Sequence, residues 1–371
     1  MLGNFPKNEF LELLKKLAIT PGPSLNEEDR LNYIKFFLNR YNIRYESDKA
    51  GNIWVPLKKG DWRDTVIFDA HVDVVEKGYC DKVAIEPGRM SGLGVGDNLT
   101  AVTMLLLMIK EVSLNKKILN YPLKVLFSLG EEGEGNLKGV RQMVNDSPLP
   151  PRLFISFDIS YNEYSKGGLG SNRYKVQVQC PGGHSWHNYG SPNAISRLIR
   201  FLQSIEPDFD KRYPGTSFNI GGISGGNGIN SIARNAEAIF EFRSIDPAIL
   251  ETIDSSINNL AGAFNKEDTH LEIIDLGKRP AAVETIPTEL DKMIQEVYTK
   301  QGIKPEHKIR STNINIPLSV GWPSVCLGLC NCFNYHREDE YVERSSLPRG
   351  WGILNDLLQM TFFYPDNNGK F

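Results

Sequence analysis

Hydrophobic residues follow one pattern in the outer parts of the chain and another in its middle. Up to about residue 170, short apolar runs alternate with amphipathic or fully apolar segments, which predicts buried strands followed by helices. Strands are expected at 53–57, 66–68, 123–129 and 153–157, and helices at 5–17, 99–112 and 136–144. After Gly277 the same pattern returns, with a helix expected at 288–301, a strand at 324–329 and a last helix at 347–362.

The middle of the chain has the pattern of a sheet with one covered face. Polar and apolar side chains alternate over 173–179, as in an antiparallel strand that has one face in water. Helices are expected at 193–205 and 248–264, and further strands at 231–245 and 271–276. This order predicts a small α+β domain. We therefore expect a discontinuous α/β domain, residues 1–170 and 278–371, that carries an inserted domain of residues 171–277.

A second helix is expected after the break at residues 20–23, TPGP. Ser24 and Glu27 have the spacing of a capping box, in which both side chains bind backbone N–H groups at the start of a helix. Leu31, Ile34 and Leu38 would then lie on one helix face.

Composition excludes several classes of function. The net charge of −3 gives no basic surface for nucleic acid. No apolar run approaches the roughly 20 residues that span a membrane, and the first residues lack the charged and apolar regions of a secretory signal. The five cysteines are dispersed and odd in number, which argues against a disulfide framework. We expect a cytoplasmic protein that binds neither nucleic acid nor membranes.

Acidic and imidazole side chains follow the predicted strands. In open α/β sheets, ligands bind beyond the carboxyl ends of the strands, so we expect these side chains to converge. His71 and Asp73 are two residues apart, so their side chains leave the same face of an extended chain. The other candidates, in chain order, are Asp97, Glu131, Glu132, Asp158 and His336.

Each candidate has a simpler explanation when it is taken alone. His71 is then a core histidine bonded to a nearby aspartate, and Glu131 and Glu132 lie in an exposed loop. Converging carboxylates repel one another, however, and bound divalent cations remove that conflict. Imidazole nitrogen combined with carboxylate oxygen suits zinc, with manganese or cobalt as alternatives. The glycine-rich segment 91–100, SGLGVGDNLT, matches neither a dinucleotide fingerprint nor a phosphate loop.

The segments FDAHVDVV, GVGDN, GEEG, FDIS, PGGHSWH and NYHREDEYV occur in this order along the chain. Together they resemble the co-catalytic dizinc metallopeptidases that include peptidase T, aminoacylase, acetylornithine deacetylase and glutamate carboxypeptidase. The resemblance covers essentially the whole chain. It implies a mixed, mostly parallel sheet with helices on both faces, and an inserted domain that acts as a lid and dimerisation domain.

The same resemblance implies roles for the converging residues. His71, Asp97 and Asp158 would hold one metal ion, and Asp97 would bridge to a second ion held by Glu132 and His336. Asp73 would accept a hydrogen bond from His71. Glu131 would be the general base that takes a proton from the attacking water.

The resemblance also assigns three residues of the inserted domain. His184, which often comes from the partner subunit in this family, would help to hold the oxyanion. Asn230 and Arg243 match positions that bind a substrate carboxylate in relatives. The simpler alternatives are a turn cap for His184 and, for Arg243, an exposed strand residue paired with a neighbouring acid.

Substrate preference follows from smaller differences within the family. An aspartate at position 158 resembles the aminopeptidase and dipeptidase branch, whereas glutamate there goes with carboxypeptidases and several deacylases. The segment GGHSWHNYGSPNAI differs from that of peptidase T, and Asn98 follows Asp97 where a second aspartate is commoner. We expect a hydrolase of short peptides, similar to an aminopeptidase, tripeptidase or dipeptidase. A deacylase of N-acyl amino acids is the alternative, and a non-catalytic peptide-binding homologue is disfavoured by the complete ligand set.

Overall fold

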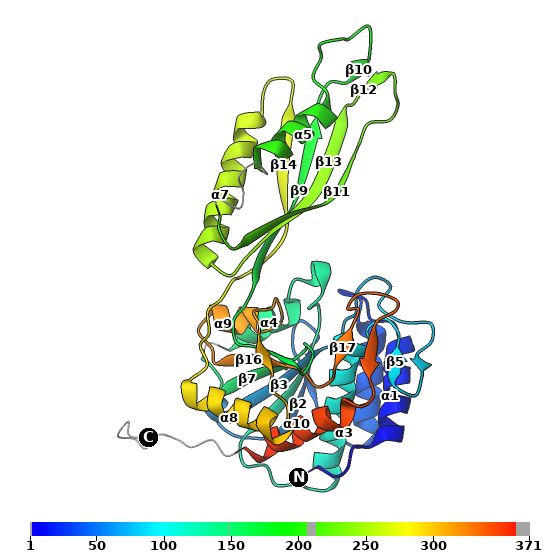
Figure 1. The fold of residues 1–371 in the computed structure, drawn as a ribbon, viewed down its shortest axis with the longest axis vertical. Coiled ribbons are helices and arrows are strands. Elements are labelled where there is room, and N and C mark those ends of the chain that lie inside the picture. The colour runs from blue at the N-terminus through cyan, green and yellow to red at the C-terminus, as the bar shows by residue number, and fades with distance from the viewer. Residues whose placement is uncertain (1, 148, 206–212, 361–371) are drawn as a thin grey trace, which may run out of the picture. The chain divides into compact units, whose positions relative to one another are not determined.

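The computed structural model describes residues 2–147, 149–205 and 213–360, and the chain forms two compact units (Figure 1). The discontinuous unit contains Met1–Gly167 and Val283–Phe371, and the inserted unit contains Gly168–Ala282. The sequence pattern predicted the insertion at 171–277. The observed division lies slightly outside that range because the first and last strands of the inserted unit are longer than the alternating pattern indicated.

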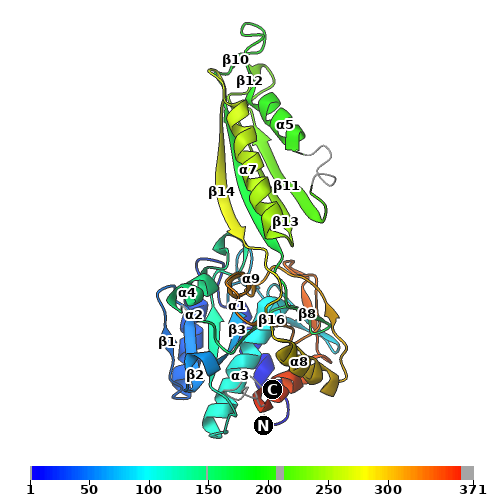
Figure 2. The same cartoon turned by 90° about the vertical axis from the view of Figure 1, so that its left-hand side faces the viewer.

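The discontinuous unit is built on a mixed sheet with the strand order β1-β2-β6-β3-β7-β16-β8-β15. Neighbours are parallel from β6 through β3 and β7 to β16, whereas β2 and β8 are antiparallel to this centre. Helices cover both faces (Figures 1 and 2). The strands are β1 (Glu46–Ser47), β2 (Ile53–Lys58), β3 (Val66–His71), β6 (Leu123–Ser128), β7 (Leu153–Phe157), β8 (Glu163–Ser165), β15 (Glu306–His307) and β16 (Ser324–Leu327).

The central strands and helix α3 form the core. Every residue of β3 and β7 is buried, as expected for parallel strands covered on both faces. Helix α3 (Thr100–Leu114) is buried continuously from Thr100 to Ile109 and packs on β2 and β3. Its nearly uniform hydrophobicity predicted this burial.

The other helices of this unit are α1 (Lys7–Ile19), α2 (Glu28–Arg40), α4 (Lys138–Asp146), α8 (Thr288–Lys300), α9 (Asn315–Ser319) and α10 (Leu347–Gln359). They are amphipathic except for the short α9, which is buried from Asn315 to Leu318. The predicted end of the last helix, at residues 361–362, lies outside the described residues. The capping-box prediction is wrong, because α2 begins at Glu28 without a side-chain cap. Within the described residues, no helix is both long and apolar enough to cross a membrane.

A small antiparallel sheet joins the C-terminal region to the segment that precedes α3. Its order is β17-β18-β5-β4. The strands are β4 (Ala84–Ile85), β5 (Arg89–Ser91), β17 (Cys332–Phe333) and β18 (Tyr341–Glu343). Pairing of β18 with β5 brings the loop that carries His336 to the loop that carries Asp97.

The inserted unit is an antiparallel sheet, of order β11-β13-β9-β14, with α5 and α7 on one face (Figure 2). Its elements are β9 (Gly170–Gln179), α5 (Ala194–Ile205), β11 (Thr216–Gly225), β13 (Asn235–Ser244), α7 (Pro247–Phe264) and β14 (His270–Arg279). The strand predicted at 231–245 is divided between residues 232 and 235. Its first residues form β12 (Ser231–Ile232), which pairs with β10 (Gly183–His184) instead of continuing the main sheet.

Candidate metal centre

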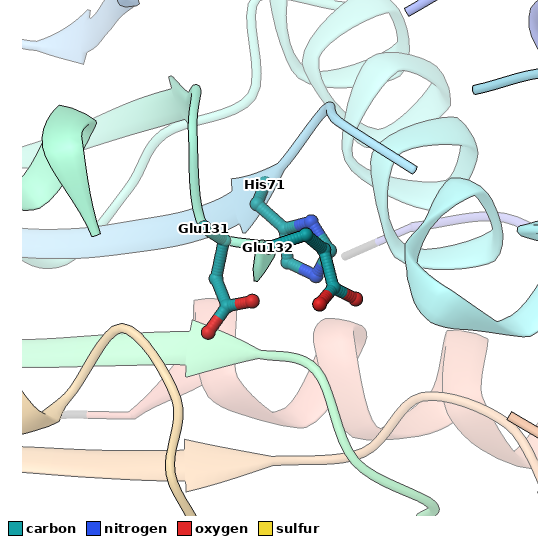
Figure 3. Close-up of side chains that lie close together, drawn as sticks. All are labelled: His71, Glu131 and Glu132. Atoms are coloured by element: carbon teal, nitrogen blue, oxygen red, sulfur yellow. The ribbon is translucent and has the colours of Figure 1, made fainter. Parts of the chain in front are cut away.

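The chemically active side chains lie where β3, β6 and β7 end. These strands are parallel neighbours, so the segments that follow them emerge at the same edge of the sheet. His71 is the last residue of β3, Glu131 and Glu132 follow β6, and Asp158 follows β7 directly. Figure 3 shows the His71 ring and the carboxyl groups of Glu131 and Glu132 on the same side of the chain.

His71 is 1% exposed and is surrounded by aspartates. Its Nε2 atom lies 3.0 Å from Oδ1 of Asp97 and 3.8 Å from Oδ1 of Asp158. Its Nδ1 atom lies 3.1 Å from the carbonyl oxygen and 3.5 Å from Oδ1 of Asp73. One ring nitrogen therefore faces the candidate metal ligands, and the other faces a group that orients the ring.

His336 approaches the same carboxylate from the opposite end of the chain. Its Nε2 atom lies 3.2 Å from Oδ2 of Asp97 and 2.9 Å from Oε1 of Glu132. The two oxygens of Asp97 thus face two different imidazoles. This is the position that a bridging carboxylate requires.

Two groups of side chains have the composition and spacing of metal sites. One contains His71, Asp97 and Asp158, and the other contains Asp97, Glu132 and His336; in each, the potential ligand atoms lie within 4.8 Å of one another. His71 also forms a group of this size with Glu131 and Glu132. Nitrogen and oxygen donors in such sets suit zinc and related divalent ions.

The pKa shifts support this interpretation. Hydrogen bonds to Asp97 and Glu132 raise the pKa of His336 to about 11. Burial lowers the pKa of His71, but hydrogen bonds to Asp158, Asp73 and Asp97 outweigh burial and raise it well above its usual value. Burial and then the charge of Asp97 raise the pKa of Glu132. These raised pKa values show that the carboxylates favour positive charge between them. A divalent ion can supply that charge in place of protons.

Asp73 holds both His71 and the loop that follows β6. It is fully buried, its Oδ1 accepts a hydrogen bond from Glu131 N (3.0 Å), and its Oδ2 accepts one from Glu132 N (2.8 Å). Burial would raise the pKa of Asp73, but the hydrogen bond and charge of His71 and the hydrogen bonds from Ser24 and Glu132 N together outweigh burial and lower it. Asp73 thus remains an acceptor at neutral pH. Glu131 itself is 3% exposed beside these groups.

Glu340 binds the backbone of the Asp97 loop in the same way as Asp73 binds the loop that follows β6. The sequence did not single it out. It is 1% exposed, and its carboxylate accepts hydrogen bonds from the backbone N–H groups of Gly94 (3.1 Å), Gly96 (2.7 Å) and Asp97 (2.9 Å). A Cβ atom on Gly96 would lie 1.8 Å from Sγ of Cys332, so glycine at this position allows Cys332 to pack closely against the loop. The glycine-rich segment therefore binds a carboxylate of the protein itself, that of Glu340.

A second polar cluster that the sequence did not indicate lies beneath the site. Asp69, fully buried in β3, accepts hydrogen bonds from Ser128 Oγ (2.6 Å), Ser156 Oγ (2.8 Å) and Asn313 Nδ2 (2.9 Å). These bonds link β3, β6 and β7 just before the residues that form the site. In the sequence, the only signal was a charged residue inside an apolar strand.

In the inserted unit, His184 and Asn230 lie side by side. His184 pairs with Ser231, and Ser185 N donates to the carbonyl oxygen of Asn230 (2.9 Å). Both His184 and Asn230 are exposed. Nδ1 of His184 accepts a hydrogen bond from Trp186 N (3.2 Å), so the histidine also caps its own turn.

Arg243 lies far from these two residues. It is near the end of β13, eight residues beyond Asn235, which corresponds to about 27 Å of extended strand. Its Nε atom donates to Oε1 of Glu241 (2.9 Å), the pairing of the simpler alternative. Asn230 and Arg243 thus lie apart within the inserted unit, and their assignment to a substrate carboxylate stays a prediction.

Comparison with known proteins places these features in a family. A family profile described as "Peptidase family M20/M25/M40" matches residues 67–360. The chain is 28% identical over 217 residues to a protein of Pyrococcus abyssi named as a LysW-lysine/LysW-ornithine hydrolase, and the match spans 58% of each chain. It is 23% identical over 301 residues to acetylornithine deacetylase of Shigella sonnei, covering 78% of this chain and 73% of that protein.

The fold is also found among solved structures. The crystal structure of a tripeptidase from Staphylococcus aureus superposes with a TM-score of 0.80, covering 97% of this chain and 99% of that chain. The sequence identity is 17%, so this similarity concerns the fold.

Proposed function

Because the chain belongs to peptidase family M20/M25/M40, we propose that it hydrolyses amide bonds of short peptides at a dinuclear metal site. The proposed ligands are His71 and Asp158 for one ion, Glu132 and His336 for the other, and Asp97 for both. The observation that supports this most directly is that the oxygens of Asp97 lie 3.0 Å and 3.2 Å from the Nε2 atoms of His71 and His336. A single carboxylate can bridge ions about 3.5–4 Å apart.

The donor set favours zinc, with manganese or cobalt as alternatives. When bound, two such ions polarise the scissile carbonyl and lower the pKa of the attacking water. Asp73 orients the His71 ring through Nδ1, and Glu340 fixes the backbone of Asp97. These supporting contacts keep the ligand atoms in place before any substrate arrives.

Glu131 is the proposed general base. Its backbone is held by Asp73 (3.0 Å), and its carboxyl group lies on the same side of the chain as His71 and Glu132 (Figure 3). A carboxylate there can accept a proton from the attacking water and return it to the leaving amine. A protein that only binds peptides has no need for such a group, which argues against the non-catalytic alternative.

Replacement of Glu131 by Gln tests this role. The amide cannot accept the proton but keeps the size of the side chain, so turnover should fall by at least about 100-fold while metal content stays unchanged. Glu134→Gln, an exposed neighbour in the same loop, is the matched control and should retain the wild-type rate. Near-normal turnover by Glu131→Gln would rule out the assignment.

For the substrate, we propose a short peptide cleaved near its N-terminus. Asp158 supports this choice, since aspartate at this position resembles the aminopeptidase and dipeptidase branch. The sequence similarity to acetylornithine deacetylase supports a second candidate, a deacylase of N-acyl amino acids. Release of free amino acid from a tripeptide and from an N-acetyl amino acid, measured side by side on the zinc-loaded protein, separates the two.

We further propose a homodimer in which the inserted unit acts as a lid. His184 and Asn230 lie together, and large apolar side chains near them in sequence are exposed: Trp186 by 81% and Tyr189 by 90%. Exposed apolar residues of this size are typical of surfaces that bind a partner or a substrate. His184 of one subunit would help to hold the oxyanion in the active site of the other, and Asn230 and Arg243 would bind a substrate carboxylate.

A further inference from the structure

The two side chains that the sequence predicted as a helix cap bind the proposed catalytic loop instead. Ser24 Oγ donates a hydrogen bond to Oδ2 of Asp73 (2.6 Å), and Oε1 of Glu27 accepts one from Gly130 N (2.9 Å). Residue separations of 49 and 103 along the chain show that these are tertiary contacts. A local capping motif binds amides of its own helix and does not account for these tertiary contacts.

Glu27 and Asp73 together accept hydrogen bonds from three successive backbone N–H groups. Gly130 N donates to Glu27, and the N–H groups of Glu131 and Glu132 donate to the two oxygens of Asp73. Glu27 is 5% exposed, and its Oε1 also accepts from Leu25 N (2.9 Å). The loop that carries the proposed base is thus held by two buried carboxylates, one of which is oriented by Ser24.

The segment that supplies Ser24 and Glu27 is itself firmly attached. Val74 N donates to the carbonyl oxygen of Gly22 (3.0 Å), which places this segment beside the residues that follow His71. The guanidinium of Arg30 is fully buried and donates to several backbone carbonyl groups, among them Val72 O at 2.7 Å and Thr20 O at 2.7 Å. A carboxylate on so rigid a support can fix the position of another loop.

We propose that Ser24 and Glu27 are positioning residues for the reaction, which set the backbone position of Glu131 relative to the proposed metal ligands. This inference rests on the proposed function of Glu131 as the base. A displacement of about 1 Å at a reacting group can lower the rate by roughly 100-fold, so loss of the Glu27 contact should reduce kcat more than it changes KM. The metal ligands keep their own contacts, so metal content should stay unchanged.

Three variants separate positioning from general stability. Glu27→Ala removes the acceptor for Gly130 N, whereas Glu27→Gln keeps an oxygen acceptor of nearly the same shape. Ile34→Ala is the matched control, because Ile34 is fully buried in α2 and its truncation destabilises the same region without removing a bond to the loop. Ser24→Ala, which removes one hydroxyl, carries the test if Glu27→Ala does not fold.

Amide hydrogen exchange gives a readout that does not depend on activity. For the peptide covering residues 129–135, exchange should become at least about tenfold faster in Glu27→Ala, the lower end of the range that one hydrogen bond to a charged group represents. It should return towards the wild-type rate in Glu27→Gln and stay unchanged in Ile34→Ala. The kcat values should follow the same order.

The inference is overturned if exchange in this peptide is unchanged in Glu27→Ala and Ser24→Ala, or if Ile34→Ala accelerates it equally. It is also overturned if kcat of a folded Glu27→Ala protein stays within about twofold of wild type, because an intact rate means that the loop is not positioned by this contact. A wild-type protein that hydrolyses no amide would instead refute the proposed function. The exchange measurement would still decide whether Ser24 and Glu27 hold the loop that carries Glu131.

Discussion

Nε2 of His336 lies 3.2 Å from Oδ2 of Asp97, although 239 positions separate these residues along the chain. The other oxygen of Asp97 faces His71, 26 positions away. The inserted unit lies between Asp97 and His336 in sequence, so only the return of the chain to the discontinuous unit brings the second imidazole into the site. The fold thus places a carboxylate between two histidines, which is the basis of the proposed dinuclear centre.

Asp97→Asn should lower both metal stoichiometry and activity. The amide supplies a single oxygen donor and no charge, so it cannot bridge two cations. The loss should exceed the roughly 10- to 100-fold that removal of a supporting residue costs in metal affinity or activity. Metal analysis of the purified variant checks this, with the exposed Asp81→Asn as the control. Two tightly bound ions in Asp97→Asn would contradict the bridging role.

Metal binding should stabilise the folded protein. A ligand that binds only the folded state adds about 2.7 kcal/mol at a free concentration of 100 times Kd. Thermal unfolding after chelation and after addition of zinc should therefore differ clearly for wild type, and hardly at all for Asp97→Asn. An identical Tm for chelated and zinc-loaded wild-type protein would argue that these carboxylates do not hold an ion.

The dimer proposal predicts complementation between two inactive variants. Glu131→Gln lacks the base and His184→Ala lacks the lid histidine, but a mixed dimer contains one intact combination if the lid serves the partner. Half of randomly re-formed dimers are mixed, so activity should recover to roughly one quarter of the wild-type rate. Activity that stays at the level of the separate variants would place His184 in its own subunit's site or outside the reaction.

Asp69→Ala should strongly destabilise the discontinuous unit. It removes the acceptor for three buried donors, on Ser128, Ser156 and Asn313, and each unsatisfied buried donor costs about 1–3 kcal/mol. Urea unfolding followed by circular dichroism should show a loss of about 3 kcal/mol or more. Asp81→Ala should change stability by less than about 0.5 kcal/mol, as exposed substitutions usually do. Equal stability of the two variants would show that the cluster contributes little.

Much of the discontinuous unit could be predicted from local pattern. The apolar runs that became β3, β6 and β7 are buried on both faces, and such strands have a clear signature in sequence. Their order along the chain also indicated that Glu132 and Asp158 emerge near His71. The return of the α/β pattern after Gly277 indicated an insertion. The lengths of the first and last strands of the inserted unit, β9 and β14, were underestimated.

The remaining features depend on long-range contacts that leave no local signal. Ser24 and Glu27 have the spacing of a helix cap, but their side chains bind Asp73 and the backbone N–H of Gly130 instead of the amides of the helix. Glu340 was not singled out, because nothing nearby in sequence shows that three backbone N–H groups surround it.

The central claim is that two ions bind between His71 and His336 with Asp97 shared. Anomalous diffraction from zinc-containing crystals tests it directly. We predict two anomalous peaks about 3.5–4 Å apart, with one oxygen of Asp97 on each ion. A single peak, or peaks away from Asp97, would contradict the account.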